Sequence, residues 1–148
     1  MRMRHVLAAL LLVILNLEIV NAQTSGGDSV IESLSASPGD PVRGRSIVAS
    51  RQTGLCLLCH SGPFPEERFQ GNLAPELTIS ASRLSASQLR ARIMDASRFN
   101  PGTIMPTYYK AQNLQRVAPK FSGQSILNEQ EIEDVVAFLV TLNKQNVQ

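Results

Sequence analysis

The clearest hydrophobic pattern in the chain lies near its C-terminus and predicts an amphipathic helix. Apolar residues recur there at intervals of three and four, which places them on one face of an α-helix. Asn128 can cap the start of this helix, and Glu131 can complete a capping box with it. We therefore expect a helix that runs to about Asn143 and buries a stripe of five residues, namely Ile132, Val135, Phe138, Leu139 and Leu142.

A second helix is predicted over residues 86–97. Ser85 and Gln88 form a capping box at its start. Asn100-Pro101 ends the helical pattern, because proline disfavours a helical residue before it. The predicted apolar face consists of Ala86, Leu89, Ile93 and Ala96.

The third predicted helix begins at Asp40-Pro41 and runs to about Ser50. Aspartate is a favoured cap, and proline fits the first helical position. Gly44 lies inside this helix, where glycine costs about 1 kcal/mol relative to alanine. Close approach by another helix would offset that cost, and an ordinary surface glycine is the simpler alternative.

Two long stretches, residues 61–84 and 98–127, show no regular periodicity. Loops of this length are uncommon in a compact domain unless they surround something or carry function. Strand signals are sparse. The pattern predicts an all-α domain in which three to five helices and their loops wrap around a buried object.

The N-terminus has the layout of a secretory signal peptide. Arg2 and Arg4 precede an apolar run, and Val20-Asn21-Ala22 offers small residues for cleavage after Ala22. The alternative, a transmembrane anchor, needs about 20 apolar residues, and this run is shorter. We expect residues 1–22 to be removed, which places the mature protein in the periplasm with no membrane anchor.

The mature chain divides into two parts. Residues 23–38 are rich in serine and glycine, so we expect a flexible N-terminal arm. Residues 39–148 form the single domain. Loss of Arg2, Arg4 and Glu18 with the leader changes the net charge from +2 to +1, which gives no indication of nucleic-acid binding.

The sequence Cys56-Leu57-Leu58-Cys59-His60 carries the candidate chemistry. C-x-x-C-H is the attachment pattern for c-type haem. Two thiols three residues apart can reach the two vinyl groups of a porphyrin and form thioethers, and the adjacent imidazole can then ligate the iron. The pattern predicts one covalent haem c bound by Cys56 and Cys59, with His60 as an axial ligand.

Three other interpretations of this motif are less favoured. A structural zinc site normally needs four ligands, whereas His60 is the only histidine outside the leader and no third cysteine exists. A thioredoxin-like pair expects a preceding strand, but a helix is predicted there. A disulfide across this short spacing closes a very small loop and stabilises little.

The second axial ligand must come from elsewhere in the chain. Met94 and Met105 are the methionines outside the leader. Met105 is preferred because Pro101 and Pro106 hold its loop, whereas Met94 lies on a helix and more simply fills a packing gap. Lys110 is a remote third choice. A histidine–methionine pair raises the reduction potential relative to harder donors and fills both axial positions.

Other residues around the motif are less clearly assigned by the sequence. The carbonyl of Pro75 could orient His60 by a hydrogen bond, although an ordinary loop proline is the simpler interpretation. Tyr108, Tyr109 and Lys120 could meet the haem or a partner, but solvent-facing loop positions are the commoner outcome.

The order of these motifs resembles class I cytochrome c over the whole mature domain. In that family the first and last helices cross with a glycine against an aromatic residue, and the resemblance places Gly44 and Phe138 there. It also places Pro75 at the carbonyl that bonds the haem histidine. The match is more specific to the SoxX family, through Gly71-Asn72-Leu73-Ala74-Pro75-Glu76-Leu77 and Asn100-Pro101-Gly102-Thr103-Ile104-Met105-Pro106-Thr107-Tyr108-Tyr109.

The resemblance implies that the chain is the monohaem subunit of a SoxAX complex, a heterodimer with a SoxA-like cytochrome. Such a complex acts as an L-cysteine S-thiosulfotransferase: it couples thiosulfate oxidatively to a cysteine of a sulfur-carrier protein. The resemblance places the catalytic cysteine on the partner. Both cysteines here are used in haem attachment, so the chain has no catalytic residue of its own and only transfers electrons to a soluble cytochrome c. The alternatives are a stand-alone periplasmic cytochrome c of another pathway, or a small disulfide or metal-binding module without haem.

Overall fold

The computed structural model describes residues 27–144, so the predicted leader lies outside the described residues. Within these residues there are four α-helices: α2 (Pro41–Ala49), α3 (Leu77–Ser82), α4 (Ala86–Asp95) and α5 (Glu129–Lys144). Three short 3-10 turns accompany them at Cys56–Leu58, Ala96–Arg98 and Pro119–Phe121. No strand occurs between residues 27 and 144, so the predicted all-α fold is confirmed.

The three predicted helices are capped by the residues that the sequence indicated. The carboxylate of Asp40 accepts hydrogen bonds from the N–H groups of Val42 and Arg43 at the start of α2. Ser85 and Gln88 form the capping box of α4. The Asn128 side chain accepts from the Glu131 N–H and the Glu131 carboxylate accepts from the Asn128 N–H, both at 2.9 Å, which fixes the start of α5.

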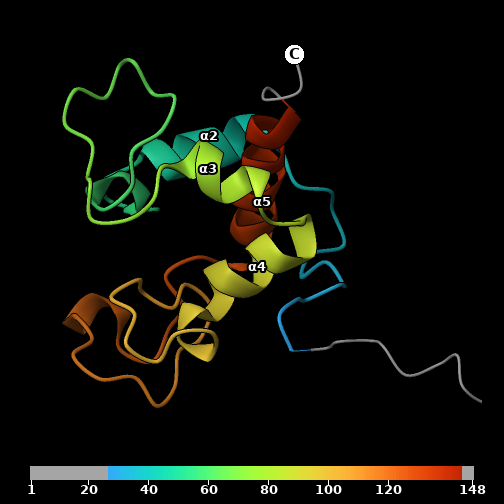
Figure 1. The fold of residues 1–148 in the computed structure, drawn as a ribbon. Helices are drawn as coiled ribbons and strands as arrows, with labels where there is room; N and C mark the ends of the chain where they lie inside the picture. The colour runs from blue at the N-terminus through green and yellow to red at the C-terminus, as the bar shows by residue number, and fades with distance from the viewer. Residues whose placement is uncertain (1–26, 145–148) are drawn as a thin grey trace, which may run out of the picture.

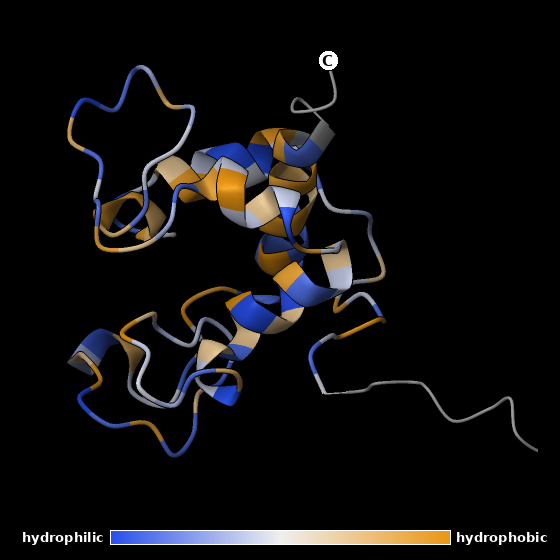
Figure 2. Ribbon diagram, in the orientation of Figure 1, coloured by the Kyte–Doolittle hydropathy of each residue, from blue (hydrophilic) through white to orange (hydrophobic). Residues whose placement is uncertain are grey.

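Helix α5 is the centre of the fold, because α2, α3 and α4 all pack against it. Figure 1 shows α2 and α3 beside one half of α5 and α4 beside the other. The two long loops extend to the same side of the molecule (Figure 1). Figure 2 shows apolar and polar residues alternating along the helices, as expected of amphipathic helices. All five residues of the predicted stripe on α5 are buried, and so is Val136 on the same helix. Leu89 and Ile93 of α4 are buried as well. Ala86 differs from the prediction: it is exposed, and the buried face of α4 begins at Leu89, one turn later.

Helix α3 lies inside a stretch for which no helix was predicted. It has six residues, of which Leu77 and Ala81 are buried. Two buried positions do not make a repeating pattern, so the periodicity of the sequence could not reveal it. None of the helices in residues 27–144 combines the length and apolar character needed to cross a membrane.

Gly44 lies where α2 crosses α5. A Cβ added to Gly44 would lie 1.9 Å from the carbonyl oxygen of Asp134 and 3.0 Å from the Cβ of Phe138. The two helix backbones are therefore in direct contact at this point, and glycine is required for that approach. The crossing of Gly44 against Phe138 that the resemblance implied is present.

The described part of the N-terminal arm, residues 27–38, lies along α4 and α5. Arg90 and Glu133, both buried, form a two-pronged ion pair with N–O distances of 2.6 and 2.8 Å. Arg90 also donates to the carbonyl of Val30 at 2.7 Å, and Glu133 accepts from the N–H of Leu34 at 3.0 Å. The buried pair thus binds the backbone of the arm, and the flexibility of the arm stays a prediction.

A second carboxylate of α5, Asp134, joins α5 to the start of α2. It is 2% exposed and accepts hydrogen bonds from Arg43 (2.7 and 2.9 Å), from the Asp40 N–H (2.7 Å) and from Gln130 (2.9 Å). Burial disfavours the charge, but these hydrogen bonds outweigh burial and hold the pKa of Asp134 below its usual value of 3.8.

We predict that Asp134→Asn destabilises the protein at pH 7 by about 1–3 kcal/mol, because charged hydrogen bonds to a buried group are lost. A carboxylate with a depressed native pKa stabilises the fold above its unfolded pKa and loses that contribution as the pH falls through the native value. The difference between wild type and variant is therefore expected to shrink below about pH 4, in thermal unfolding followed by circular dichroism.

Glu66→Gln is the matched control for this prediction. Glu66 pairs with Arg45 at 2.6 Å, but both side chains are more than 40% exposed, and exposed pairs contribute little. If the difference in stability between wild type and Asp134→Asn stayed constant from pH 7 to pH 2, the Asp134 carboxylate would not be the stabilising group proposed here.

Candidate functional site

The C-x-x-C-H segment begins with a turn that fixes its direction. Leu55 adopts a left-handed backbone with φ of 59°, and Cys56–Leu58 then form a single 3-10 turn. The N–H groups of Cys59 and His60 both donate to the carbonyl of Cys56, at 3.2 and 2.9 Å. This turn places both cysteines in half-buried positions, and their thiols are not joined in a disulfide.

His60 is oriented by the carbonyl of Pro75. The Nδ1 atom of His60 lies 2.6 Å from the carbonyl oxygen of Pro75, so Nδ1 carries the proton and donates it. The other ring nitrogen, Nε2, is thereby the one with a lone pair available for a metal ion. This is the second-sphere arrangement usual for metal-ligating histidines.

The loop after the motif returns to hold it in place. The N–H of Gly71 donates to the carbonyl of Leu57 at 2.8 Å, and the N–H of Ala74 donates to the carbonyl of Cys59 at 3.0 Å. A Cβ on Gly71 would lie 2.3 Å from the carbonyl oxygen of Leu58, so only glycine permits this approach. The motif is therefore held on both sides by backbone contacts.

The side chain of Gln70 keeps this loop ordered. Its Oε1 accepts from the N–H of Gly62 at 2.6 Å, and its Nε2 donates to the carbonyls of Phe64 and Glu67 at 2.9 and 3.1 Å. Sequence reasoning missed Gln70, because nothing in the pattern of a loop shows which amide turns inward.

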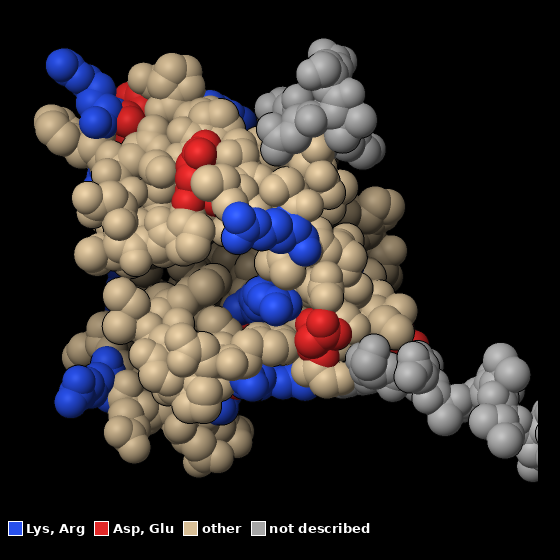
Figure 3. Space-filling model, viewed as in Figure 1, with Lys and Arg blue, Asp and Glu red and all other residues tan. Residues whose placement is uncertain are grey.

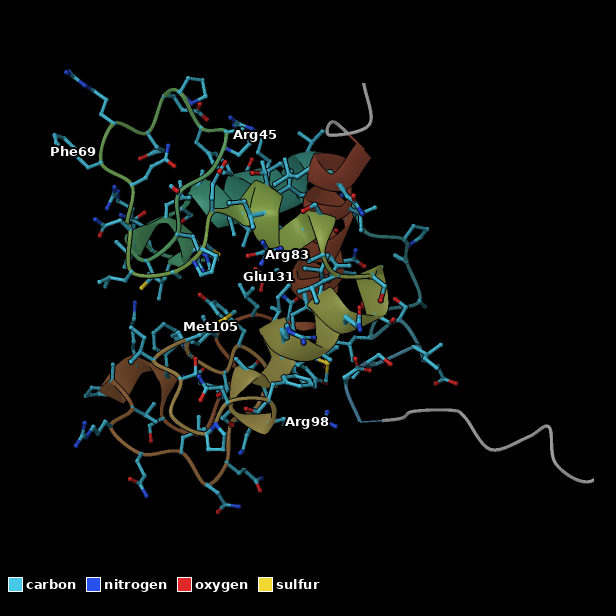
Figure 4. The ribbon with its side chains drawn as sticks, viewed as in Figure 1. Arg45, Phe69, Arg83, Arg98, Met105 and Glu131 are labelled. Atoms are coloured by element: carbon cyan, nitrogen blue, oxygen red, sulfur yellow. The ribbon has the colours of Figure 1, made fainter. Side chains whose placement is uncertain are left out.

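Met105 lies in the second long loop, opposite the motif. The carbonyl and side chain of Asn100 accept from the N–H groups of Thr103 and Gly102, and Thr103 Oγ1 accepts from the Met105 N–H at 3.1 Å. The loop is therefore ordered by its own residues. Figure 4 shows the Met105 side chain extending from this loop toward the segment that carries the cysteines.

The other candidate donors have different surroundings. Met94 belongs to α4 and is partly buried against the hydrophobic core. Lys110 forms an ion pair with Asp95, with Nζ 3.4 Å from the carboxylate oxygen. Met94 thus lies on a helix, and Lys110, although it shares the loop of Met105, is paired with Asp95. Met105 is the candidate whose side chain extends from this loop toward the motif.

A hollow separates the two loop regions. Figure 3 shows it in the space-filling view, between an upper part that contains residues 51–76 and a lower part that contains residues 98–127. Uncharged atoms surround most of its opening on this face. The C-x-x-C-H segment belongs to the upper part, and Met105, labelled in Figure 4, belongs to the lower part.

Tyr108 is buried beside this site, contrary to the solvent-facing position expected from the sequence. It is 4% exposed, and its hydroxyl donates to the carbonyl of Gly54 at 2.6 Å. Burial raises the pKa of the Cys56 thiol to about 11, against a smaller opposing effect of the Tyr108 hydroxyl beside it. Burial and the neighbouring Cys56 also raise the pKa of Tyr108. Tyr109, in contrast, bonds Glu129 at the surface, at 2.8 Å.

Comparison with known proteins identifies the family. Neither the models of protein families nor the curated proteins give a match. Among solved structures, the crystal structure of SoxXA from P. pantotrophus contains a chain that is 38% identical to this one, with a TM-score of 0.72. The match covers 79% of this chain and 91% of that chain. The chain belongs to the SoxX family.

In this SoxX-family chain the residues present fit a covalently bound haem. Two thiols free of a disulfide lie three residues apart, and the adjacent imidazole has one nitrogen left for a metal ion. The thioether of Met105 comes from the opposite side of the hollow. Cys56, Cys59, His60 and Met105 could therefore hold haem c, with Pro75 orienting the histidine.

Proposed function

We propose that this protein is the electron-transfer subunit of a SoxAX complex in sulfur oxidation. The observation that carries the proposal is the donor set. His60 is held by Pro75 with Nε2 free, both cysteines are available for thioethers, and Met105 faces them from the other loop. Haem, when bound, supplies a one-electron redox centre here. His60 and Met105 would fill both axial positions, which suits electron transfer and disfavours binding of small ligands.

The division of labour with a partner follows from the cysteines. Coupling thiosulfate to a thiol forms a sulfur–sulfur bond, releases the thiol proton and gives up two electrons, so it needs a thiolate and an electron acceptor. Cys56 and Cys59 are the only cysteines of the chain and both are assigned to haem attachment. We infer that a SoxA-like cytochrome subunit holds the reactive cysteine and receives the sulfur-carrier protein. This chain accepts the electrons and passes them to a soluble cytochrome c.

The match to a SoxXA structure supports the heterodimer over a stand-alone cytochrome, which is the second candidate function. We also propose a periplasmic location, on the strength of the predicted leader at residues 1–22. Haem attachment outside the cytoplasm would then follow export of the unfolded chain.

The test uses the mature protein made in a host that attaches haem c. We predict one haem per chain that stays bound after unfolding in acid, because thioethers are covalent. Alone, the holoprotein is expected to give no thiosulfate-dependent reduction of cytochrome c. Co-expression with a SoxA-like subunit is expected to yield a stable one-to-one complex that is active in the presence of the carrier protein.

Each alternative gives a different result in this test. A holoprotein that binds no SoxA-like subunit would indicate a stand-alone cytochrome. A colourless protein with free thiols would exclude haem altogether, and turnover of thiosulfate by the isolated chain would contradict the proposed division of labour.

A further inference from the structure

Tyr108 connects the two loop regions that carry the proposed ligands. Its backbone belongs to the Met105 side of the hollow: its N–H donates to the carbonyl of Ile93 at 3.2 Å, and its carbonyl accepts from Ile126 and Leu127 at 2.9 and 3.1 Å. Its hydroxyl belongs to the cysteine side, because it donates to the carbonyl of Gly54 at 2.6 Å. Tyr108, three residues after Met105, is thus hydrogen-bonded to Gly54, two residues before Cys56.

The carbonyl of Gly54 is where the attachment segment is fixed. It accepts from the Cys56 thiol at 3.3 Å as well as from Tyr108. Once Cys56 forms a thioether, its sulfur has no hydrogen to donate, and the Tyr108 hydroxyl is then the side-chain donor left to this carbonyl. Gly54 is itself buried against α2, since a Cβ there would lie 2.1 Å from the carbonyl oxygen of Ile47.

We propose that Tyr108 is a positioning residue that holds the Met105 loop at a fixed distance from the attachment segment, and so keeps the thioether of Met105 on the iron. This inference rests on the proposed haem ligation by His60 and Met105. The hydroxyl carries the effect, because the ring alone can pack in the core but cannot bond Gly54. Without that bond a buried carbonyl is left unpaired, and the two sides of the hollow are free to separate.

The test compares Tyr108→Phe with Tyr109→Phe in the holoprotein. Both variants remove one hydroxyl and keep the ring, but the Tyr109 hydroxyl bonds Glu129 at the surface and does not cross the hollow. In Tyr108→Phe we expect the fraction of protein with Met105 dissociated from the iron to rise about tenfold, the effect of one hydrogen bond of ordinary strength. Tyr109→Phe is expected to match wild type.

Three measurements report this change at a temperature where circular dichroism shows all the proteins folded. The thioether-to-iron charge-transfer band of the oxidised protein is expected to weaken in Tyr108→Phe. The reduction potential is expected to fall, since methionine ligation raises it. Carbon monoxide is expected to bind the reduced variant faster than wild type, because an axial position opens more often. Loss of stability alone would move none of the three in folded protein.

The outcomes separate this inference from the proposed function. If wild type shows the band and Tyr108→Phe equals Tyr109→Phe in band, potential and carbon monoxide binding, the role of Tyr108 is wrong while the ligation stands. If wild type has haem but lacks the band, the ligation by Met105 is wrong, and the role of Tyr108 fails with it.

Discussion

Met105→Ala is expected to abolish the thioether-to-iron charge-transfer band of the oxidised holoprotein. Met105 extends toward the cysteine segment from a loop ordered by Asn100 and Thr103, and alanine offers no sulfur donor. The vacant axial position is then expected to bind carbon monoxide or imidazole readily. The reduction potential is expected to fall, because the softer sulfur ligand favours the reduced state. Absorption spectroscopy and redox titration measure both effects.

Met94→Ala provides the matched control for this loss. Met94 and Met105 are both partly buried and both pack against the core, but Met94 belongs to α4 and not to the loop opposite the cysteines. Its replacement is expected to lower the free energy of unfolding by no more than about 5 kcal/mol, the upper end for truncations in a core. The charge-transfer band is expected to stay unchanged. Loss of the band in Met94→Ala with its retention in Met105→Ala would reverse the choice of ligand.

Gly44→Ala is expected to prevent the accumulation of folded holoprotein. The added methyl group would lie 1.9 Å from the carbonyl oxygen of Asp134 and 2.4 Å from its carbonyl carbon. These are backbone atoms, which no rotamer change can move, so α2 and α5 must separate. We expect a loss of stability of about 3 kcal/mol or more, at or above the usual range for overpacking. Yield of haem-containing protein and the thermal midpoint measure it.

Gly27→Ala is the control for this substitution. A Cβ on Gly27 has no atom within 4 Å, so the same chemical change meets no obstacle there. Its yield and thermal midpoint are expected to equal those of wild type. A Gly44→Ala protein that was as stable as Gly27→Ala would show that the helix crossing tolerates a wider spacing than the structure gives it.

The elements that could be predicted from sequence are those whose signals are local. The start of α5 follows from Asn128 and Glu131, which lie three residues apart, and its buried face follows from a repeat of apolar residues over three turns. The C-x-x-C-H motif is local in the same sense, since five consecutive residues specify it. The structure also contains the expected contact between the Pro75 carbonyl and His60. The roles of these residues toward haem stay predictions.

The features that could not be predicted depend on contacts between distant residues. Arg90 and Glu133 are 43 positions apart, so nothing in either neighbourhood shows that both are buried in one ion pair. Tyr108 and Gly54 are separated by 54 positions, and a tyrosine in a loop rich in proline and glycine gives no sign that its hydroxyl turns inward. Only the folded arrangement of the two loops brings such pairs together.

The packing of α2, α3 and α4 on a single C-terminal helix has a consequence for biosynthesis. Ribosomes make the chain from its N-terminus, so these three helices are complete well before the segment that covers their apolar faces. Isolated helices this short are marginal in water. A chain that stops before residue 129 would therefore lack a stable domain. The protein is expected to stay unfolded until synthesis is complete, as the proposed export requires, and then to close in one step after export.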